Sequence, residues 1–260
     1  MHPEPTITKL QSIGLGTMAT ALRDQLDNPG PYADLSFEDR LGLLVDREAD
    51  WRETRRIQTR LKAAKLRYPH AAVEEIDFRA PRGLDRGTVL SLAGAAWVTR
   101  QQNLLITGAT GCGKSFLACA IAHAAIRQGH SALYLRTPRL LDDLAVGRAD
   151  GRYARQLAAL RRAELLVLDD FLLTHASVEQ CRDLLEVVED RAQLRSTLVA
   201  SQMPVDHWHA AMADPTLAEA TLDRLLNRAY RIQLTGPSMR RRDPEDDQPP
   251  QEAPKSPGIK

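Results

Sequence analysis

The middle of the chain, from residue 83 to residue 235, alternates short apolar runs with longer stretches in which apolar residues recur at helical spacing. The short runs have the length and composition of β-strands. They predict strands at residues 103–107, 132–136, 164–168, 197–201 and 230–234. The run Leu165–Leu168 is apolar at every position, which is typical of a strand buried on both faces. This alternation predicts an α/β fold: a three-layer α/β/α core with helices on both faces of a five-stranded parallel sheet.

The first 82 residues follow a helical pattern. One helix is expected to end at Asn28–Pro31. Its apolar residues are Leu10, Ile13, Met18, Leu22 and Leu26. A second helix is expected to begin at Ser36, because Asp39 follows three residues later as in a capping box. Its buried stripe is Leu41, Leu44 and Val45. The stretch 51–70 predicts a third, basic helix.

These patterns divide the chain into three regions. Residues 1–82 are expected to form a small helical domain, and residues 83–235 the α/β domain. Residues 236–260 start with basic residues and continue with prolines among charges, a composition that cannot bury a core. We therefore expect residues 236–260 to form a disordered tail.

Composition excludes several broad classes. With 43% apolar and 27% charged residues among 260, the chain has the composition of a globular protein. It has no apolar run long enough for a membrane span, and its first residues lack the pattern of a secretory signal. Its 3 cysteines have no metal-binding spacing. We therefore expect a reduced, cytoplasmic protein with no membrane partner.

A phosphate-binding loop is the most informative local motif. The pattern GxxxxGK(S/T) is matched in full, after an apolar strand and before a helical run, by Gly108, Ala109, Thr110, Gly111, Cys112, Gly113, Lys114 and Ser115. Glycines let the backbone turn so that several N–H groups face one phosphate chain. Lys114 is expected to reach the β and γ phosphates of a bound nucleotide, and the Ser115 hydroxyl to bind Mg²⁺.

Polar residues follow the other predicted strands, at the edge of the sheet where ligands bind. Asp169 is expected to hold Mg²⁺ through water, and Asp170 to orient or deprotonate the attacking water. Gln202 follows the fourth strand and is placed to touch the γ phosphate. Arg224 precedes the last strand and is either a residue that reaches the γ phosphate of a neighbouring subunit or a surface ion-pair partner. The strand inserted between the phosphate loop and the acidic pair favours the ATPase branch of P-loop proteins over small-molecule kinases.

Together these motifs resemble an AAA+ ATPase, and longer segments resemble IstB, the ATP-binding helper of an insertion-sequence transposase. That family is related to the helicase loader DnaC and the initiator DnaA. The resemblance covers residues 8–242, and its most particular segments are SQMPVDHWH and LTGPSMRRR. It implies duplex-DNA binding, ATP-dependent assembly into homo-oligomers and recruitment of the partner transposase.

The resemblance also assigns roles to residues. It implies that Asp169 is the magnesium acid, Asp170 the catalytic acid, Gln202 the first sensor and Arg224 the arginine finger. Arg240 is a second-sensor candidate. The catalytic acid is Asp where many AAA+ proteins have Glu, so we expect slow, DNA-stimulated ATP hydrolysis. Little sequence follows the fifth strand for a helical lid, so the site is expected to depend on a neighbouring subunit.

Basic residues outside the phosphate loop are candidates for contacts with DNA phosphates. The first group lies in the predicted basic helix and comprises Arg52, Arg55, Arg56, Arg60, Lys62, Lys65 and Arg67. The second group, near Gly147 and Gly151, comprises Arg148, Arg152 and Arg155. The alternative for both groups is an ordinary solvated surface.

The leading hypothesis is therefore an ATP- and Mg²⁺-dependent helper that assembles on duplex DNA, remodels it and stimulates a transposase. A DnaC-like helicase loader uses the same ATPase with a different partner and favours single-stranded DNA. A nucleotide-binding DNA scaffold that scarcely hydrolyses ATP is a third hypothesis, and a small-molecule kinase is the most distant one.

Overall fold

The computed structural model describes residues 4–239, and its contacts divide the chain into two compact units. The first unit ends at Ala64 and the second begins at Lys65. Residues 65–82, which we expected in the helical domain, therefore belong with the α/β unit. The expected tail is wrong for residues 236–239, because the Met239 N–H donates to the Gly111 carbonyl at 2.9 Å; Arg240 and the remainder of the tail lie outside the described residues.

The first unit is helical, as expected, but its helices differ from the expected ones. It contains α1 (Glu4–Ser12), α2 (Gly16–Asp27), the short 3-10 helix η1 (Gly30–Tyr32) and α3 (Phe37–Ala64). The single helix expected across residues 10–26 is wrong, because Gly14 adopts a φ of 80° and separates α1 from α2. The expected second and third helices are one continuous helix of 28 residues, α3, which ends at Ala64 rather than at residue 70.

Helix α3 begins where the capping pattern predicted, and it packs against α2 along one stripe. The Ser36 hydroxyl accepts a hydrogen bond from the Asp39 N–H at 3.1 Å. Leu44 is buried, but Leu41 and Val45 are 40% and 50% exposed, so the expected three-residue stripe is wrong for both. The next buried residue of this stripe is Glu48, whose carboxylate accepts the Met18 N–H at 3.0 Å. This bond holds the pKa of Glu48 below its ordinary value.

The second unit contains the predicted parallel sheet. Its strands are β1 (Leu104–Gly108), β2 (Ala132–Arg136), β3 (Leu165–Asp169), β4 (Ser196–Ser201) and β5 (Tyr230–Leu234). All five predictions are confirmed to within one residue at each end. The strand order is β2-β3-β4-β1-β5, so β4 lies between the phosphate-loop strand and the acidic strand.

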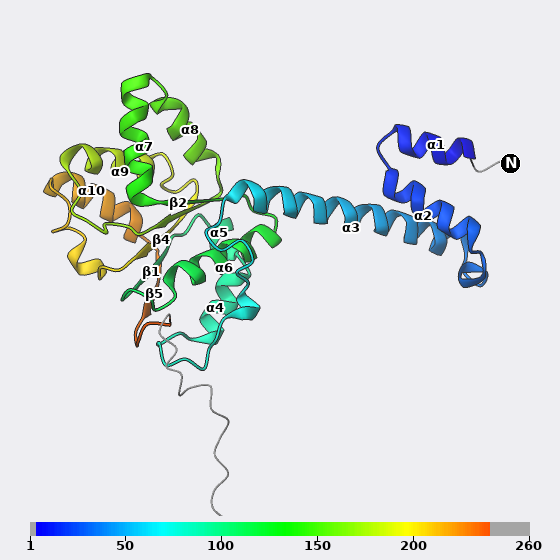
Figure 1. Cartoon of the computed structure of the whole chain (residues 1–260), viewed down its shortest axis with the longest axis horizontal. Helices are drawn as coiled ribbons and strands as arrows, with labels where there is room; N and C mark the ends of the chain where they lie inside the picture. Colours follow the sequence, from blue (N-terminus) through cyan, green and yellow to red (C-terminus); the bar gives the residue numbers. More distant parts are fainter. Residues whose placement is uncertain (1–3, 240–260) are drawn as a thin grey trace, which may run out of the picture. The chain divides into compact units, whose positions relative to one another are not determined.

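Helices cover both faces of this sheet (Figure 1). On one side lie α4 (Arg86–Ala93), α5 (Ala96–Thr99) and α6 (Lys114–Arg127). On the other lie α7 (Thr137–Asp150), α8 (Tyr153–Arg162), α9 (Val178–Glu189) and α10 (Pro215–Leu226). Two short 3-10 helices, η2 (Val73–Glu75) and η3 (Val205–His207), complete the elements.

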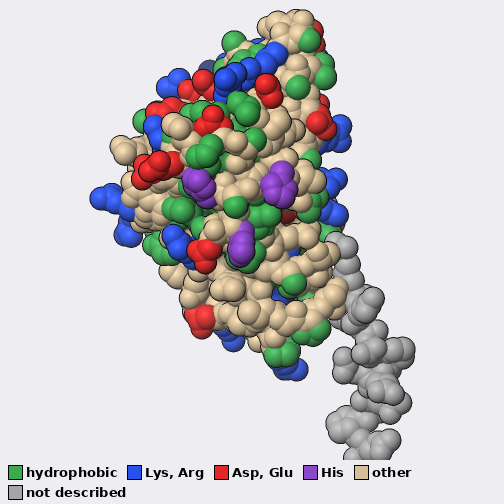
Figure 2. Space-filling view, turned by 90° about the vertical axis from the view of Figure 1, so that its left-hand side faces the viewer, with side chains coloured by type: hydrophobic (Ala, Val, Ile, Leu, Met, Phe, Trp, Pro, Cys, Tyr) green, Lys and Arg blue, Asp and Glu red, His purple; other side chains and the backbone are tan. Residues whose placement is uncertain are grey.

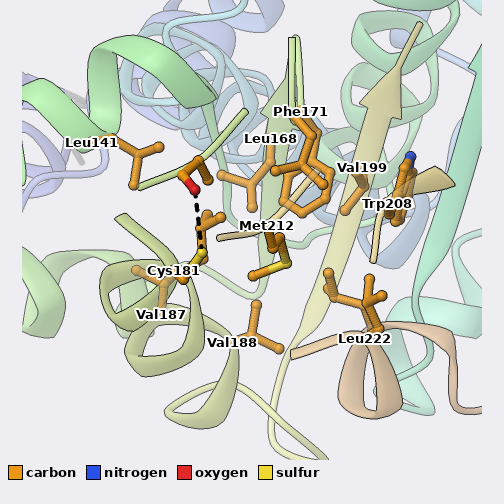
Figure 3. Packing of buried hydrophobic residues seen from close by; sticks show 14 of the residues in the cluster. Leu141, Leu168, Phe171, Cys181, Val187, Val188, Val199, Trp208, Met212 and Leu222 are labelled. Carbon is orange, nitrogen blue, oxygen red and sulfur yellow. Dashed lines mark hydrogen bonds between the residues drawn. The ribbon is translucent and has the colours of Figure 1, made fainter. Parts of the chain in front are cut away.

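A hydrophobic core fills the space between the sheet and helices α7–α10 (Figure 3). Leu168 of β3 and Val199 of β4 point toward α9 and α10, and Phe171 packs edge to face against Trp208 with ring centroids 4.9 Å apart. The Cys181 thiol donates to the Ala176 carbonyl at 3.7 Å within this core. Because β3 is buried along its whole length, the residue at its end is fixed firmly in place.

Alternation along β3 decides which face each side chain occupies. Leu166 and Leu168 belong to the core on the α7–α10 side. Successive residues of a strand point to opposite faces, so Asp169 lies on the α6 side. Tyr134 of β2 is paired with Val167 and shares that face. The sheet thereby aims an acid and a phenol toward the helix that follows the phosphate loop.

No helix among residues 4–239 combines the length and the apolar character that crossing a lipid bilayer requires.

Candidate nucleotide-binding site

The phosphate loop connects β1 to α6, as its sequence predicted. Gly113 is the residue before α6 and has a φ of 95°, a conformation that side chains with a Cβ disfavour. A Cβ at Gly113 would also lie 2.7 Å from the Arg82 Nη1 atom. Both constraints require glycine at residue 113. Helix α6 then begins at Lys114, so the positive end of its dipole lies at the loop, where it favours a bound anion.

Side chains of the loop contact the neighbouring strand ends. The ammonium of Lys114, which is 8% exposed, donates to the Ala109 carbonyl at 2.8 Å. The Thr110 hydroxyl donates to the Gln202 side-chain oxygen at 2.6 Å. Gln202, the residue that follows β4, therefore lies at the phosphate loop.

Asp169 and Asp170 end β3 in different environments. Asp169 is 1% exposed, and its Oδ2 accepts the Tyr134 hydroxyl at 2.5 Å. Its Oδ1 accepts the backbone N–H of Asp170 at 2.9 Å. Asp170 has a left-handed φ of 54°, lines the cavity beside the loop and forms an ion pair with Arg136 at 2.8 Å. Asp169 is thus the buried acid of the pair and Asp170 the one that lines the cavity.

Arg67 lies at this site rather than on the basic helix. Its Nη1 is 4.0 Å from Oδ2 of Asp169, and its guanidinium also interacts with Tyr134. Burial, together with the bond to Asp169, raises the pKa of Tyr134 far above its ordinary value, so the phenol keeps its proton and donates it. The placement of Arg67 on the basic helix is wrong, because α3 ends at Ala64 and Arg67 lies beside Asp169 at the end of β3; a contact of Arg67 with DNA stays a prediction.

A cavity of about 360 Å³ lies beside the loop. Residues expected from the sequence line it, namely Thr110, Gly111, Gly113, Lys114, Ser115, Asp170 and Gln202. Its other lining residues were not assigned to a nucleotide site from the sequence; they are Arg67, Tyr68, Glu75, Asp77, Arg82, Phe116 and Met239. Most of them come from the irregular segment 65–82. The sequence of this segment contains no motif that predicts a nucleotide contact.

Arg82 provides a test of whether this cavity suits a nucleotide. It is 6% exposed, and its Nη2 donates to the Asp77 carbonyl at 2.8 Å. Its buried Nε has no hydrogen-bond partner among the described residues. A buried donor of positive charge beside Gly113 fits an anionic ligand on the loop. The glycine conformations, Lys114 and this donor together fit the phosphates of ATP.

The residues also suit a magnesium ion bound together with a nucleotide. Ser115 lines the cavity, and Asp169 lies at the end of β3 on the α6 side. No group of three His, Cys, Asp or Glu side chains within residues 4–239 forms a cluster able to hold a metal by itself. Mg²⁺ commonly takes few protein ligands and completes its shell with water and phosphate oxygens. Ser115 and Asp169 would supply the protein part of such a shell.

Arg224 lies near the amino end of β1, whereas the phosphate loop follows the carboxyl end of this strand. The side chain of Asn103, the residue before β1, donates to the Arg224 carbonyl at 3.1 Å. Since β1 has 5 residues, Arg224 is separated from the loop by roughly 15 Å of strand. Its guanidinium pairs with Glu189 and lines a separate cavity of about 450 Å³. Arg224 therefore cannot serve the phosphate loop of its own chain.

Some basic residues on the predicted face of α3 form ion pairs or hydrogen bonds with other side chains or the backbone, and others do not. Arg52 pairs with Glu48 at 2.7 Å and donates to the Gly14 carbonyl at 2.8 Å, so it stabilises the first unit. Arg55 stacks over the exposed Trp51 ring at 5.1 Å. Arg56, Arg60 and Lys62 have no ion-pair partner within the described part of the chain. Lys65 follows the end of α3 with a left-handed φ of 52°.

The second predicted basic group lies on α7 and α8 and is mostly paired. Arg148 forms an ion pair with the buried Asp183 and stacks on Tyr153 at 4.4 Å, and Arg152 pairs with Asp150. Gly147 is a buried helix residue rather than part of a flexible flank. Arg155 is exposed. The face seen in Figure 2 intersperses Lys and Arg with Asp and Glu, so it presents no continuous surface of one charge.

The strand order, with β4 inserted between the phosphate-loop strand and the acidic strand, is that of AAA+ P-loop domains. Solved structures confirm this class. The crystal structure of DnaI aligns with a TM-score of 0.55 at 20% identity and covers 64% of this chain and 92% of that chain. DnaA bound to AMPPCP and single-stranded DNA aligns with a TM-score of 0.52 at 16% identity, over 64% of this chain and 50% of that chain. At these identities the similarity shows the fold alone.

Sequence comparison identifies the family. The model of the IstB-like ATP binding protein matches residues 8–246, and the chain belongs to this family. The insertion sequence ATP-binding protein y4pL of Sinorhizobium fredii is 46% identical over 241 residues, which cover 93% of this chain and 98% of that protein. The ATP-binding protein of insertion sequence IS1162 from Pseudomonas fluorescens is 44% identical over 215 residues, or 83% and 93% of the two chains. The chain is thus an insertion-sequence ATP-binding protein with an AAA+ fold.

Proposed function

We propose that this protein is an ATP-controlled helper of a transposase, which assembles on duplex DNA when ATP and Mg²⁺ are bound and is reset by hydrolysis. Family membership supports the transposition context. The site supports ATP and Mg²⁺ through Lys114, Ser115 and Asp169. The single observation that carries the proposal is that the phosphate loop follows β1, whereas Arg224 lies beside Asn103 at the other end of this strand.

Arg224 suits a role between subunits. An arginine that lies one strand length from its own loop does not reach a nucleotide there, so any nucleotide that it contacts belongs to another chain. Such contacts generate head-to-tail interfaces, which close into rings or continue as spirals. In this assembly Arg224 exchanges its ion pair with Glu189 for the γ phosphate of the neighbour and offsets the charge of the transition state.

Hydrolysis depends on Asp170, and the structure contains a restraint on it. A carboxylate acts as a general base when it is ionised and within hydrogen-bond reach of the attacking water. Arg136 holds Asp170 through an ion pair at 2.8 Å. Arg136 must release Asp170 before this carboxylate can accept a proton. We therefore expect slow hydrolysis in the isolated chain and faster hydrolysis in the assembly on DNA.

Contacts with DNA are assigned to basic residues of α3, namely the exposed Arg55, Arg56 and Lys62 and the half-buried Arg60, with the exposed Arg155 as a separate candidate on α8. Each phosphate contact that is lost lowers the dependence of log affinity on log salt by about 0.9 for duplex DNA. Replacing Arg56 with alanine should produce such a decrease. Arg47→Ala is the matched control, because Arg47 lies on the same helix and pairs with Asp24.

The experiment that tests the proposal measures assembly on DNA by analytical ultracentrifugation and electron microscopy, with a slowly hydrolysed ATP analogue and Mg²⁺. The wild-type chain should form nucleotide-dependent oligomers on duplex DNA, and Lys114→Ala should not. A preference for single-stranded DNA would favour a helicase loader instead. Phosphate release that Asp170→Asn leaves unchanged would favour a DNA scaffold.

Mixing two inactive variants tests the role between subunits. Arg224→Ala retains its own Asp170, and Asp170→Asn retains its own Arg224. A mixture contains interfaces at which both residues are intact, so it should regain hydrolysis that neither variant shows alone. If the mixture stays inactive while both variants assemble normally, Arg224 does not act across the interface.

A further inference from the structure

Asp169, the predicted magnesium acid, is engaged on both oxygens by donors of its own chain. Tyr134 donates to Oδ2 at 2.5 Å, and the Arg67 Nη1 lies 4.0 Å from the same oxygen. The Asp170 N–H occupies Oδ1 at 2.9 Å. The two hydrogen-bond donors, Tyr134 and the Asp170 N–H, are neutral, and Arg67 adds a positive charge through its ion pair with Asp169. None of the steps described above uses Arg67.

Arg67 and a magnesium ion compete for the Asp169 carboxylate, because both carry a positive charge. A buried carboxylate is costly unless a cation or several hydrogen bonds stabilise it, and Asp169 is 1% exposed. A guanidinium at this position supplies that charge, but it also repels a second cation. The Arg67 side chain is 38% exposed, so it has room to leave, whereas Tyr134 is buried. Arg67 is therefore the movable member of the group.

Arg67 lies close to helix α3 in the sequence. Helix α3 ends at Ala64, and Arg67 is the third residue after it. The segment around it is attached to the helix of the phosphate loop. Leu66 is 6% exposed, and the Tyr68 ring lies 6.0 Å from the ring of Phe116 on α6. A movement of the Arg67 side chain away from Asp169 therefore occurs in the short segment 65–68, which follows α3 and is held in place by the packing of Leu66 and Tyr68.

We propose that Arg67 is the counter-cation of Asp169 in the nucleotide-free protein, that it leaves Asp169 when Mg²⁺ and ATP are held, and that this exchange transmits the nucleotide state to helix α3. Arg67 is a positioning residue in this scheme, since it acts through Asp169 and the segment 65–68. The inference rests on the proposed function for the presence of ATP and Mg²⁺ and for DNA binding by α3.

The first test measures the dissociation constant of a fluorescent ATP analogue in EDTA and in Mg²⁺. The constant in EDTA divided by the constant in Mg²⁺ is the magnesium gain, which is larger when Mg²⁺ strengthens binding more. Removing a competing cation should raise the gain of Arg67→Ala about fivefold over wild type. Arg67→Lys retains the charge and should restore a gain near that of wild type. Arg79→Ala is the control, because Arg79 is an exposed arginine of the same segment without an ion-pair partner within residues 4–239.

The outcomes of this test separate the alternatives. If Arg67→Ala weakens analogue binding equally with and without Mg²⁺, so that its gain stays within twofold of wild type, Arg67 is a direct nucleotide ligand and the proposal is overturned. A lower gain would also overturn it, because Arg67 would then assist the metal rather than compete with it. Neither result depends on hydrolysis or on DNA.

The second test measures transmission to α3. Duplex-DNA affinity is compared without nucleotide and with the slowly hydrolysed analogue and Mg²⁺, at saturating analogue for every variant. The nucleotide-dependent change seen in wild type should shrink to less than twofold in Arg67→Ala and persist in Arg79→Ala. Persistence in Arg67→Ala would overturn the transmission. If wild type shows no DNA binding, the proposed function fails, while the magnesium gain still decides whether Arg67 is the counter-cation.

Discussion

Arg191 is a buried cation without a carboxylate partner among residues 4–239, and its replacement is a quantitative test of how the sheet positions the site. The residue is 1% exposed and donates to the carbonyls of Leu160 and Ala163 at 2.5 and 2.9 Å. It also donates to the Ser196 carbonyl at 2.5 Å. These acceptors lie at the ends of α8 and at the starts of β3 and β4. Arg191 thus ties together the amino ends of the strands whose other ends carry Asp169 and Gln202.

Arg191→Met changes the free energy of unfolding through two effects of opposite sign. Burial lowers the pKa of Arg191 to about 9, which shows that holding this charge inside the protein is unfavourable by itself. Arg191→Met removes that penalty and fills much of the space. It also leaves three buried carbonyls without their donor, at roughly 1–3 kcal/mol each. Because the relieved desolvation cancels part of this loss, we expect a net destabilisation of about 2–4 kcal/mol.

Urea unfolding followed by circular dichroism measures this change. The matched control is Arg195→Met, since Arg195 is an exposed neighbour whose charge disfavours that of Arg191. The control should change the free energy of unfolding by less than about 0.5 kcal/mol. If Arg191→Met is neutral or stabilising, its bonds to the carbonyls do not outweigh its burial, and the reasoning is refuted.

Three further predictions concern the loop, the catalytic acid and acid stability. Gly113→Ala should destabilise the protein by about 1–2 kcal/mol because of its left-handed φ, and should abolish stabilisation by ATP in thermal unfolding; unchanged stabilisation would contradict the loop geometry. Arg136→Ala should raise phosphate release severalfold by freeing Asp170, and a lower rate would show that Arg136 assists catalysis instead. Burial by itself would raise the pKa of Glu164, but donors on Ser131 outweigh it and the pKa is lowered. A lowered pKa stabilises the fold above the ordinary value of 4.5, so the stability difference between wild type and Glu164→Gln should shrink as pH falls below it; a constant difference in urea unfolding would contradict this assignment.

Features set by local pattern could be predicted from the sequence. The five strands follow from apolar runs of strand length, and their pairing confirms the parallel sheet. The phosphate loop is contiguous in the chain, so its motif places Lys114 and Ser115 together. The positions of Asp169 and Gln202 follow because the carboxyl ends of parallel strands meet at one edge.

Features set by tertiary contacts could not be predicted in this way. The wall formed by residues 65–82 is irregular, and only the folded chain brings Arg82 to Gly113 and Arg67 to Asp169. Charge alone grouped Arg67 with the basic helix, although α3 ends before it. Likewise, the acidic partner of Arg148 is distant in sequence, so a basic cluster and a structural ion pair have the same local pattern.

Breaks between helices depend on single residues. Gly14 ends the run of apolar residues that suggested one helix, because its left-handed φ separates α1 from α2. Conversely, no proline interrupts residues 37–64, and α3 continues through the point where we expected two helices to meet.

Calorimetric titration of ATP into the protein in the presence of Mg²⁺ tests the central claim most directly, which is that the triphosphate binds on the loop between β1 and α6. The account predicts saturable binding of one ATP per chain, lost in Lys114→Ala, with Arg79→Ala binding as wild type does. Absence of binding by folded wild-type protein, or equal binding by Lys114→Ala, would contradict it.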